Sequence, residues 1–196
     1  MKPITEVLTE QGAHFDTEDR KNGEIAYKIK EHFTEFYKGT AVRSYWEYTG
    51  TVIIADVSGK GIPAALFMMR SKTAIKSLAE SGRTPGEIFE KANDTLCEGN
   101  DADMFVTAWI GIVDLETGKV QCANAGHEYP AIKRADGKWE LFKDKHCLAL
   151  AAMEGMPYNA QQITLSKSDR LFVYTDGVTE ASNAQNELYG EERLLA

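Results

Sequence analysis

The sequence predicts an α+β domain in which a pair of helices covers one face of an antiparallel sheet. Residues 61–96 carry two helical patterns in succession, and residues 104–174 carry short apolar runs separated by turn residues. Neighbouring strands joined by turns are typical of antiparallel sheet, and consecutive helices pack together as one layer. The length of 196 residues suits one domain with room for an appendage.

The N-terminal region is predicted to hold a helix and then a hairpin. Apolar residues at spacings of three and four predict a helix over 22–38, which Gly39 ends. An apolar, β-branched strand is predicted over 51–55. We interpret Thr49-Gly50 as a two-residue turn that joins this strand to an earlier one over 42–48.

Two helices are predicted after this hairpin. Pro63 fits the first turn of one helix, where its missing N–H costs nothing, and Gly82 ends that helix. The second helix begins at Thr84-Pro85-Gly86-Glu87, which fits a capping box with proline in the first turn. Further strands are predicted at 104–113, 120–125, 129–134, 139–142, 161–165 and 171–174, and a last helix begins at 191–195.

The composition excludes several classes of function. A formal charge of -8 gives no electrostatic basis for binding nucleic acid, and it fits ordinary solubility better than a site that gathers cations. Three cysteines without a CxxC pair or a disulfide framework favour a reducing cytoplasm. The chain has no signal-peptide core and no apolar run near the ~20 residues of a membrane span. We therefore expect a cytoplasmic chain without membrane contact of its own, and any membrane sensor would lie outside it.

Two predicted strands each end in an aspartate that a glycine-containing turn follows. Asp56 opens the motif Asp56-Val57-Ser58-Gly59-Lys60-Gly61, and Asp176 lies in Thr175-Asp176-Gly177. A strand end holds a carboxylate on a rigid base, and hard divalent cations need oxygen ligands. Together the two motifs predict a metal site. Taken alone, the first motif is equally compatible with an aspartate that caps the turn before the helix.

Lys60 and His127 are candidates for contacts to a phosphate group. A nucleotide-binding P-loop is excluded, because Gly61 stands where that motif requires serine or threonine after the lysine. A solvated loop lysine is therefore the simpler interpretation of Lys60. His127, at the end of Asn124-Ala125-Gly126-His127, would donate a proton or a hydrogen bond, although a structural loop histidine is favoured. The adjacent His146 and Cys147 are discounted as a pair, because neighbours in a strand point to opposite faces.

These motifs together resemble one protein family. Residues 56–68 resemble the core motif of the PPM-type phosphatases of the stage II sporulation protein E family, and four further blocks follow in the family's order at 124–127, 153–156, 174–181 and 187–190. The resemblance implies a four-layer α-β-β-α sandwich with two Mn²⁺ or Mg²⁺ ions at one edge of the sheets. It also implies hydrolysis of phosphoserine or phosphothreonine by a metal-bound water, without a phosphoenzyme.

The resemblance also assigns roles to individual residues and to the regions of the chain. Asp56 would bridge the two metals, the Val57 carbonyl would bind one of them, and Asp176 would bind one. The substrate would be a phosphoprotein such as an anti-sigma-factor antagonist, in bacterial partner-switching signalling. Residues 1–40 are predicted to form a helical segment of unknown role, and residues 41–196 are predicted to form the phosphatase domain.

Two departures from the family pattern predict a sandwich that is incomplete at its N-terminal hairpin and its C-terminal end. The family carries a Gly-Gly-Asp-Phe-Tyr-Asp block one strand before the core motif, where this chain has Arg43 to Tyr48. The family's final Asp-Asp block would lie after Ala196. With a turn at Thr49-Gly50, Arg43 lies opposite Asp56, where we expect its guanidinium to pair with that carboxylate and repel a cation. The alternative to a phosphatase is therefore a catalytically impaired fragment or relative that acts as a protein-interaction module.

Overall fold

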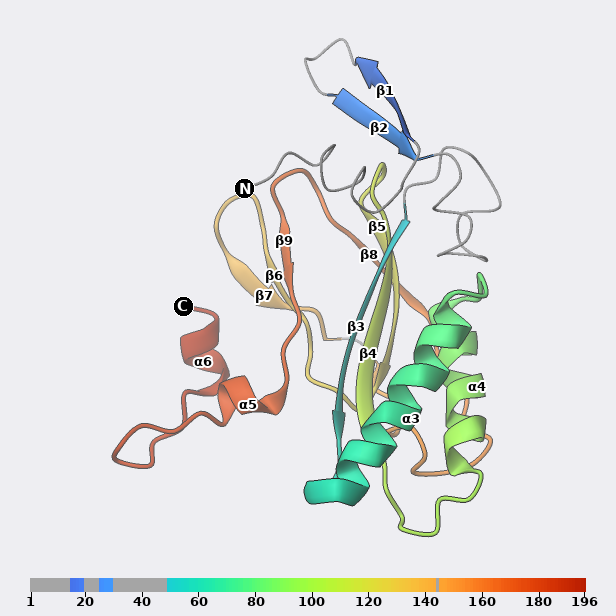
Figure 1. Cartoon of the computed structure of the whole chain (residues 1–196). Coiled ribbons are helices and arrows are strands. Elements are labelled where there is room, and N and C mark those ends of the chain that lie inside the picture. The colour runs from blue at the N-terminus through green and yellow to red at the C-terminus, as the bar shows by residue number, and fades with distance from the viewer. Residues whose placement is uncertain (1–14, 20–24, 30–48, 144) are drawn as a thin grey trace. The chain divides into compact units, whose positions relative to one another are not determined.

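The computed structural model describes residues 15–19, 25–29, 49–143 and 145–196, in two compact units divided between Glu47 and Tyr48 (Figure 1). In the first unit, β1 (Phe15–Asp19) pairs antiparallel with β2 (Ile25–Ile29). The helix predicted over 22–38 is therefore wrong at β2, and its other residues lie outside the described ranges. Ile25, Tyr27 and Ile29 also alternate with less apolar residues, so this short run fits a strand as well as a helix. The predicted division at residue 40 stays a prediction.

The second unit contains a four-stranded antiparallel sheet in the order β3-β4-β5-β8. Its strands are β3 (Thr49–Val57), β4 (Val106–Asp114), β5 (Lys119–Ala125) and β8 (Gln161–Thr164). Thr49 and Gly50 are strand residues that pair with Asp114 and Val113, so the turn predicted there is wrong. A two-residue turn of the favoured type needs φ > 0 at both residues, which a β-branched threonine resists. The register that placed Arg43 beside Asp56 loses its basis, and Arg43 itself lies outside the described residues.

A second, three-stranded antiparallel sheet follows the order β7-β6-β9. Its strands are β6 (Ala131–Lys133), β7 (Trp139–Leu141) and β9 (Arg170–Phe172). Trp109 and Val120 from the first sheet share one buried cluster with Ile132 from the second, so this part of the core lies between the sheets. β5 alternates between exposed and buried residues from Lys119 to Cys122, and its last four residues are all buried.

Two paired helices, α3 (Gly61–Ala79) and α4 (Pro85–Cys97), cover the outer face of the first sheet (Figure 1). The capping box predicted at α4 is confirmed, because the Thr84 N–H donates to Glu87 Oε2 at 2.9 Å and Glu87 N–H donates to Thr84 Oγ1 at 3.4 Å. Two short helices, α5 (Asp176–Thr179) and α6 (Gly190–Leu194), follow β9. The predicted α+β class is confirmed. No helix in the described part of the chain combines the length and apolar character needed to cross a membrane.

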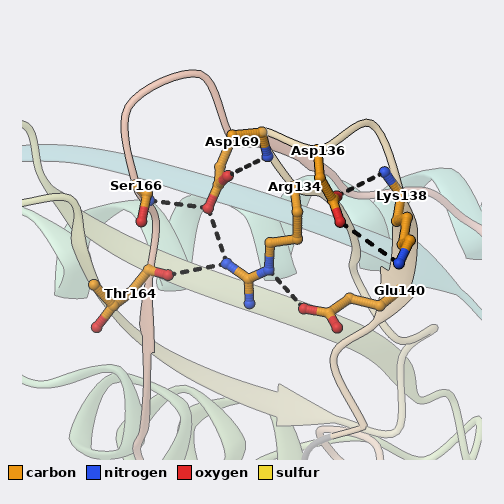
Figure 2. Close-up of polar contacts among 8 residues, drawn as sticks. Arg134, Asp136, Lys138, Glu140, Thr164, Ser166 and Asp169 are labelled. Atoms are coloured by element: carbon orange, nitrogen blue, oxygen red, sulfur yellow. Dashed lines mark hydrogen bonds and ion pairs between the residues drawn. The ribbon is translucent and has the colours of Figure 1, made fainter.

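Arg134 links the second sheet to the end of the first (Figure 2). Its Nη1 donates to Asp169 Oδ2 at 2.9 Å and to the Thr164 carbonyl at 3.2 Å, while its Nε donates to Glu140 Oε1 at 2.6 Å. Asp169 also accepts from the main-chain N–H groups of Ser166 and of the residue after Arg134, each at 2.9 Å. One guanidinium and one carboxylate thus tie β6, β7, β8 and the turn before β9 together.

We expect Asp169→Asn to lower the thermal midpoint at neutral pH and to flatten its acid dependence. Hydrogen bonds from the Ser166 backbone and then from Arg134 hold the pKa of the Asp169 carboxyl below its usual range. A lowered pKa in the folded state adds stability above the unfolded-state value of about 3.9, and this stability is lost as pH falls from about 5 toward about 2. Thermal unfolding across that range measures the effect.

The control for this prediction is Asp136→Asn, which also removes one carboxylate from the same end of the molecule. Asp136 is exposed, and its carboxylate interacts with Lys138 within its own turn. Exposed local pairs of this kind contribute little to stability. An Asp169→Asn variant with the wild-type midpoint and the wild-type acid slope would contradict the prediction.

Candidate functional site

The sheet topology brings Asp56, Asp176 and His127 into one region. Asp56 lies near the end of β3 and pairs with Thr107 near the start of β4. His127 follows the end of β5, and Asp176 begins α5 after β9. The carboxylates of Asp56 and Asp176 both act to raise the pKa of His127. Such an effect requires short distances, so both carboxylates lie near the imidazole. Motifs far apart in the sequence thus meet at one edge of the two sheets, as predicted for a site.

The loop after Asp56 is anchored to the start of β4. Ser58 N–H donates to the Phe105 carbonyl, and Phe105 N–H donates to Ser58 Oγ, both at 2.9 Å. Gly59 has a φ of 81°, a conformation that side chains disfavour. The N-cap of α3 is Lys60, whose exposed side chain makes no capping bond, so the exposed Asp56 carboxylate does not cap this helix. Asp56 therefore faces solvent on a fixed strand end.

His127 is buried and makes three hydrogen-bonding contacts with two residues, Asn124 and Thr107. Its N–H donates to Asn124 Oδ1 at 2.7 Å, and its carbonyl accepts from Asn124 Nδ2 at 3.1 Å. Its Nδ1 lies 2.9 Å from Thr107 Oγ1, and this hydroxyl also lies 3.4 Å from the Asp56 carbonyl, so its single proton goes either to the imidazole or to that carbonyl. These bonds give His127 the structural role favoured from the sequence, and they also fix the direction of its ring.

The other ring nitrogen of His127, Nε2, is buried. Among the described residues it has no hydrogen-bond partner of good geometry, while a hydrogen bond between the ring and the Tyr174 backbone acts to raise the pKa of His127. Burial is the largest influence and lowers the pKa of His127 below its usual value, against the opposing effects of Tyr174, Asp56 and Asp176. The imidazole is therefore neutral at neutral pH and offers one nitrogen to a ligand as a hydrogen-bonding group.

Glu128 is a group near the site that the sequence interpretation did not identify. Burial, and then the negative charges of Glu191, Asp176 and Glu180, raise the pKa of this half-buried carboxyl. The phenol of Tyr174 is buried nearby and has no hydrogen-bond partner in the described part of the chain. Burial, with Glu128 and Glu191, raises the pKa of Tyr174 to about 12. The region around Asp176 is therefore strongly negative, and only the position of Glu128 beside His127 could have signalled it.

The residues present supply oxygen ligands for a divalent cation but an incomplete set for two. Asp56 and Asp176 offer carboxylates, and Val57 offers a main-chain carbonyl. Mg²⁺ often binds through one or two carboxylates while water and substrate phosphate complete its octahedron. Across the described ranges no group of three or more His, Cys, Asp or Glu side chains is arranged to hold a metal ion. The described residues therefore supply ligands for one divalent ion with open coordination positions, and a second ion would need ligands beyond them.

Comparisons with known proteins identify similar chains along the whole second unit. The family model described as stage II sporulation protein E matches residues 49–196. The phosphoserine phosphatase RsbU of Bacillus subtilis (strain 168) is 35% identical over 131 residues, which cover 66% of this chain and 38% of that protein. This chain thus spans well under half the length of that relative.

Two solved structures share the fold at low sequence identity. The SiaA-PP2C domain of Pseudomonas aeruginosa has a TM-score of 0.62 at 16% identity, over 94% of this chain and 63% of that chain. The catalytic domain of the serine/threonine protein phosphatase PstP, in complex with 2 manganese ions, has a TM-score of 0.55 at 13% identity, over 71% of this chain and 73% of that chain. Both likenesses show the predicted sandwich fold.

Proposed function

Because this chain belongs to the stage II sporulation protein E family, we propose that its 49–196 part acts as a metal-dependent phosphatase on phosphoserine or phosphothreonine in proteins. The observation that carries the proposal is the meeting of Asp56, Asp176 and His127 at one edge of the sheets, inside the matched segment. In the reaction, a water oxygen bonds to phosphorus while the bond from phosphorus to the serine or threonine oxygen breaks. A proton from the water ends on that oxygen, so the free hydroxyl and inorganic phosphate are the products.

The proposed site divides this work between the cation and the chain. A bound Mn²⁺ or Mg²⁺ would activate water and neutralise phosphate charge, and PstP with its two manganese ions supports two such ions as the full complement. Asp56, near the end of β3, and Asp176, at the start of α5, would hold the cation. With its proton on Nε2, the His127 ring would donate a hydrogen bond to a phosphate oxygen, because the described residues give this nitrogen no hydrogen-bond partner of good geometry. Lys60 is exposed at the start of α3, where it would contact a substrate phosphate.

A metal titration tests the proposed activity. We expect the full 196-residue chain to hydrolyse p-nitrophenyl phosphate and a phosphoserine peptide when Mn²⁺ is added, and to lose this turnover when EDTA is added. Saturation with Mn²⁺ gives the apparent metal affinity. The absence of turnover at any Mn²⁺ or Mg²⁺ concentration, in a chain that is folded by circular dichroism, would contradict the proposed enzyme.

A catalytically impaired interaction module is the second candidate. The small number of clustered metal-binding side chains in the described ranges favours it. Calorimetric titration with Mn²⁺ distinguishes the two candidates, because the module requires no metal whereas the phosphatase requires a saturable site. Binding that disappears in Asp56→Asn would favour the phosphatase.

The proposed setting is bacterial cytoplasmic signalling, with a phosphoprotein as partner. The relative RsbU is named a phosphoserine phosphatase, which supports a phosphoserine as the target. We propose a phosphorylated anti-sigma-factor antagonist as the protein that carries it. The formal charge of -8 disfavours nucleic acid as a partner.

A further inference from the structure

Asn93 is a polar residue on the otherwise apolar buried face of α4. Its neighbours on that face, Ile88, Phe89, Ala92 and Leu96, are fully buried, and Asn93 itself is 0% exposed. An amide buried among such side chains is costly unless hydrogen bonds satisfy it. Asn93 is thus a place where the fold keeps a polar group for a specific contact.

The Asn93 amide holds one stretch of the loop between β7 and β8. Its Nδ2 donates to the Met153 carbonyl at 2.9 Å, and its Oδ1 accepts from the Ala151 N–H at 2.9 Å and the Tyr158 hydroxyl at 3.2 Å. Ala151 has a φ of 65°, in the left-handed region that an alanine rarely adopts. This strained turn is thus held in place by a side chain from another element.

The loop stretch from Cys147 to Met153, here termed the 147–153 segment, is bonded to the strand ends of the site. Leu150 exchanges two main-chain hydrogen bonds with Val106, at 2.9 and 3.0 Å, and Cys147 N–H donates to the Asn124 carbonyl at 3.1 Å. Val106 directly precedes Thr107, and Asn124 brackets His127 through its side chain. The segment therefore supports Thr107, which contacts the His127 ring, and Asn124, which holds the His127 main chain.

Gly126 shows how closely the 147–153 segment approaches His127. A Cβ added at Gly126 would lie 3.3 Å from Ala149 N and 3.5 Å from Cys147 O, and the φ of Gly126 is 66°. The segment backbone thus packs directly on the residue that precedes His127. A displacement of this segment would act on the orientation of the imidazole and, through Thr107, on the Asp56 backbone.

We propose that Asn93 is a positioning residue of the phosphatase site, which fixes the 147–153 segment and thereby the orientation of His127. This inference rests on the proposed function, since it assigns Asn93 a role in that reaction without contact to the substrate. The chain of contacts is continuous: Asn93 holds Ala151 and Met153, Leu150 holds Val106, and Thr107 meets His127.

The test uses three variants of graded severity in the full chain. Asn93→Leu removes all three hydrogen bonds and keeps the branched shape of the side chain. Asn93→Asp keeps the acceptor and loses the amide donor, and Tyr158→Phe removes only the hydroxyl. The matched control is Arg134→Gln, which breaks polar contacts next to Thr164. Thr164 pairs with Lys119 at the start of β5, and His127 follows the end of β5. The length of β5 therefore separates the control site from His127 by roughly 20 Å at ~3.3 Å per residue.

Two measurements follow each variant. The first is the imidazole nitrogen spectrum of the metal-free chain, with the His127 signals identified through their loss in His127→Gln. The second is the turnover of p-nitrophenyl phosphate with Mn²⁺. We expect the Asn93 variants to shift the His127 signals and to lower kcat by about 10-fold to 100-fold with a smaller change in KM, as for residues that orient catalytic groups. We expect Tyr158→Phe to change the His127 signals and kcat in the same direction but by less. We expect Arg134→Gln to lower stability and to leave the His127 signals and kcat unchanged.

The outcomes separate this inference from the proposed function. Unchanged His127 signals and unchanged kcat in Asn93→Asp and Tyr158→Phe would overturn the positioning role, even if Asn93→Leu failed to fold. A wild-type chain without metal-dependent turnover would instead sink the proposed function. In that case the His127 signals alone decide whether Asn93 orients the ring.

Discussion

Replacement of Asp56 by asparagine is expected to lower Mn²⁺-dependent turnover of p-nitrophenyl phosphate by about 10²-fold or more. Changes to groups that merely orient a metal ligand already lower metal affinity or activity by 10-fold to 100-fold. Loss of the charge of a proposed ligand is therefore expected to lower activity by more. Asparagine keeps the size and the carbonyl oxygen of the side chain, and Asp56 is exposed. The fold is therefore expected to persist while the affinity for the cation falls.

Asp176→Asn is the companion test, because Asp176 lies in the same region at the start of α5, which follows β9 of the second sheet. Both variants are expected to raise the Mn²⁺ concentration needed for half-maximal rate and to leave the urea midpoint near that of the wild type. Asp136→Asn, with one carboxylate removed from an exposed turn, controls for the change in net charge. Wild-type turnover and wild-type metal affinity in Asp56→Asn would show that the cation, if any, binds elsewhere.

The features of the fold that the sequence predicted depend on neighbours along the chain. The capping box at Thr84 joins groups three residues apart, and it is present. The turn at Thr49-Gly50 failed because the described partner of β3 is β4, which lies beyond α3 and α4 in the chain. The helix over 22–38 failed at β2 because a run of five residues satisfies both periods. Pairing with another strand, β4 in the first case and β1 in the second, decides such cases, and the pattern of the run itself does not encode it.

In the candidate site too, some residues are visible from local sequence patterns and others depend on the folded structure. Asp56, Asp176 and His127 stand out because each follows a strand beside glycine, a pattern visible in the sequence. Thr107 matters because it is the direct partner of Asp56 in the pairing of β3 with β4. Asn93 matters because it binds a loop that lies about sixty residues further along the chain. Neither residue has a local motif. Register and tertiary packing place them, so a single sequence cannot identify them.

Trp109→Ala is expected to cost about 3–5 kcal/mol of unfolding free energy, the largest stability loss that we predict for one side chain. Trp109 is fully buried in β4, where it packs in the cluster between the two sheets with Val120, Ile132 and Ile163. Domains of this size are stable by only about 5–15 kcal/mol, so the cavity would remove a large part of the total. Urea denaturation followed by circular dichroism measures the change.

Gly111 explains why no neighbour can fill that cavity cheaply. A Cβ added at Gly111 would lie 2.3 Å from Trp109 Cη2, so the indole ring covers the glycine two residues along the same face of β4. Removal of the ring leaves both the indole volume and the bare glycine backbone uncovered between the sheets. The sandwich has no side chain at residue 111 to move into the space, and strands held by ladders on both sides of β4 resist collapse.

Trp109→Phe is the matched control for this prediction and separates lost volume from lost polarity. The indole Nε1 is buried without a hydrogen-bond partner in the described ranges, so phenylalanine removes a polar group that contributes no bond. Loss of such an unsatisfied donor offsets part of the volume lost. We therefore expect Trp109→Phe to cost well under half of what Trp109→Ala costs. Equal losses in the two variants would mean that the indole N–H is bonded in solution, and that polarity as well as packing holds the two sheets together.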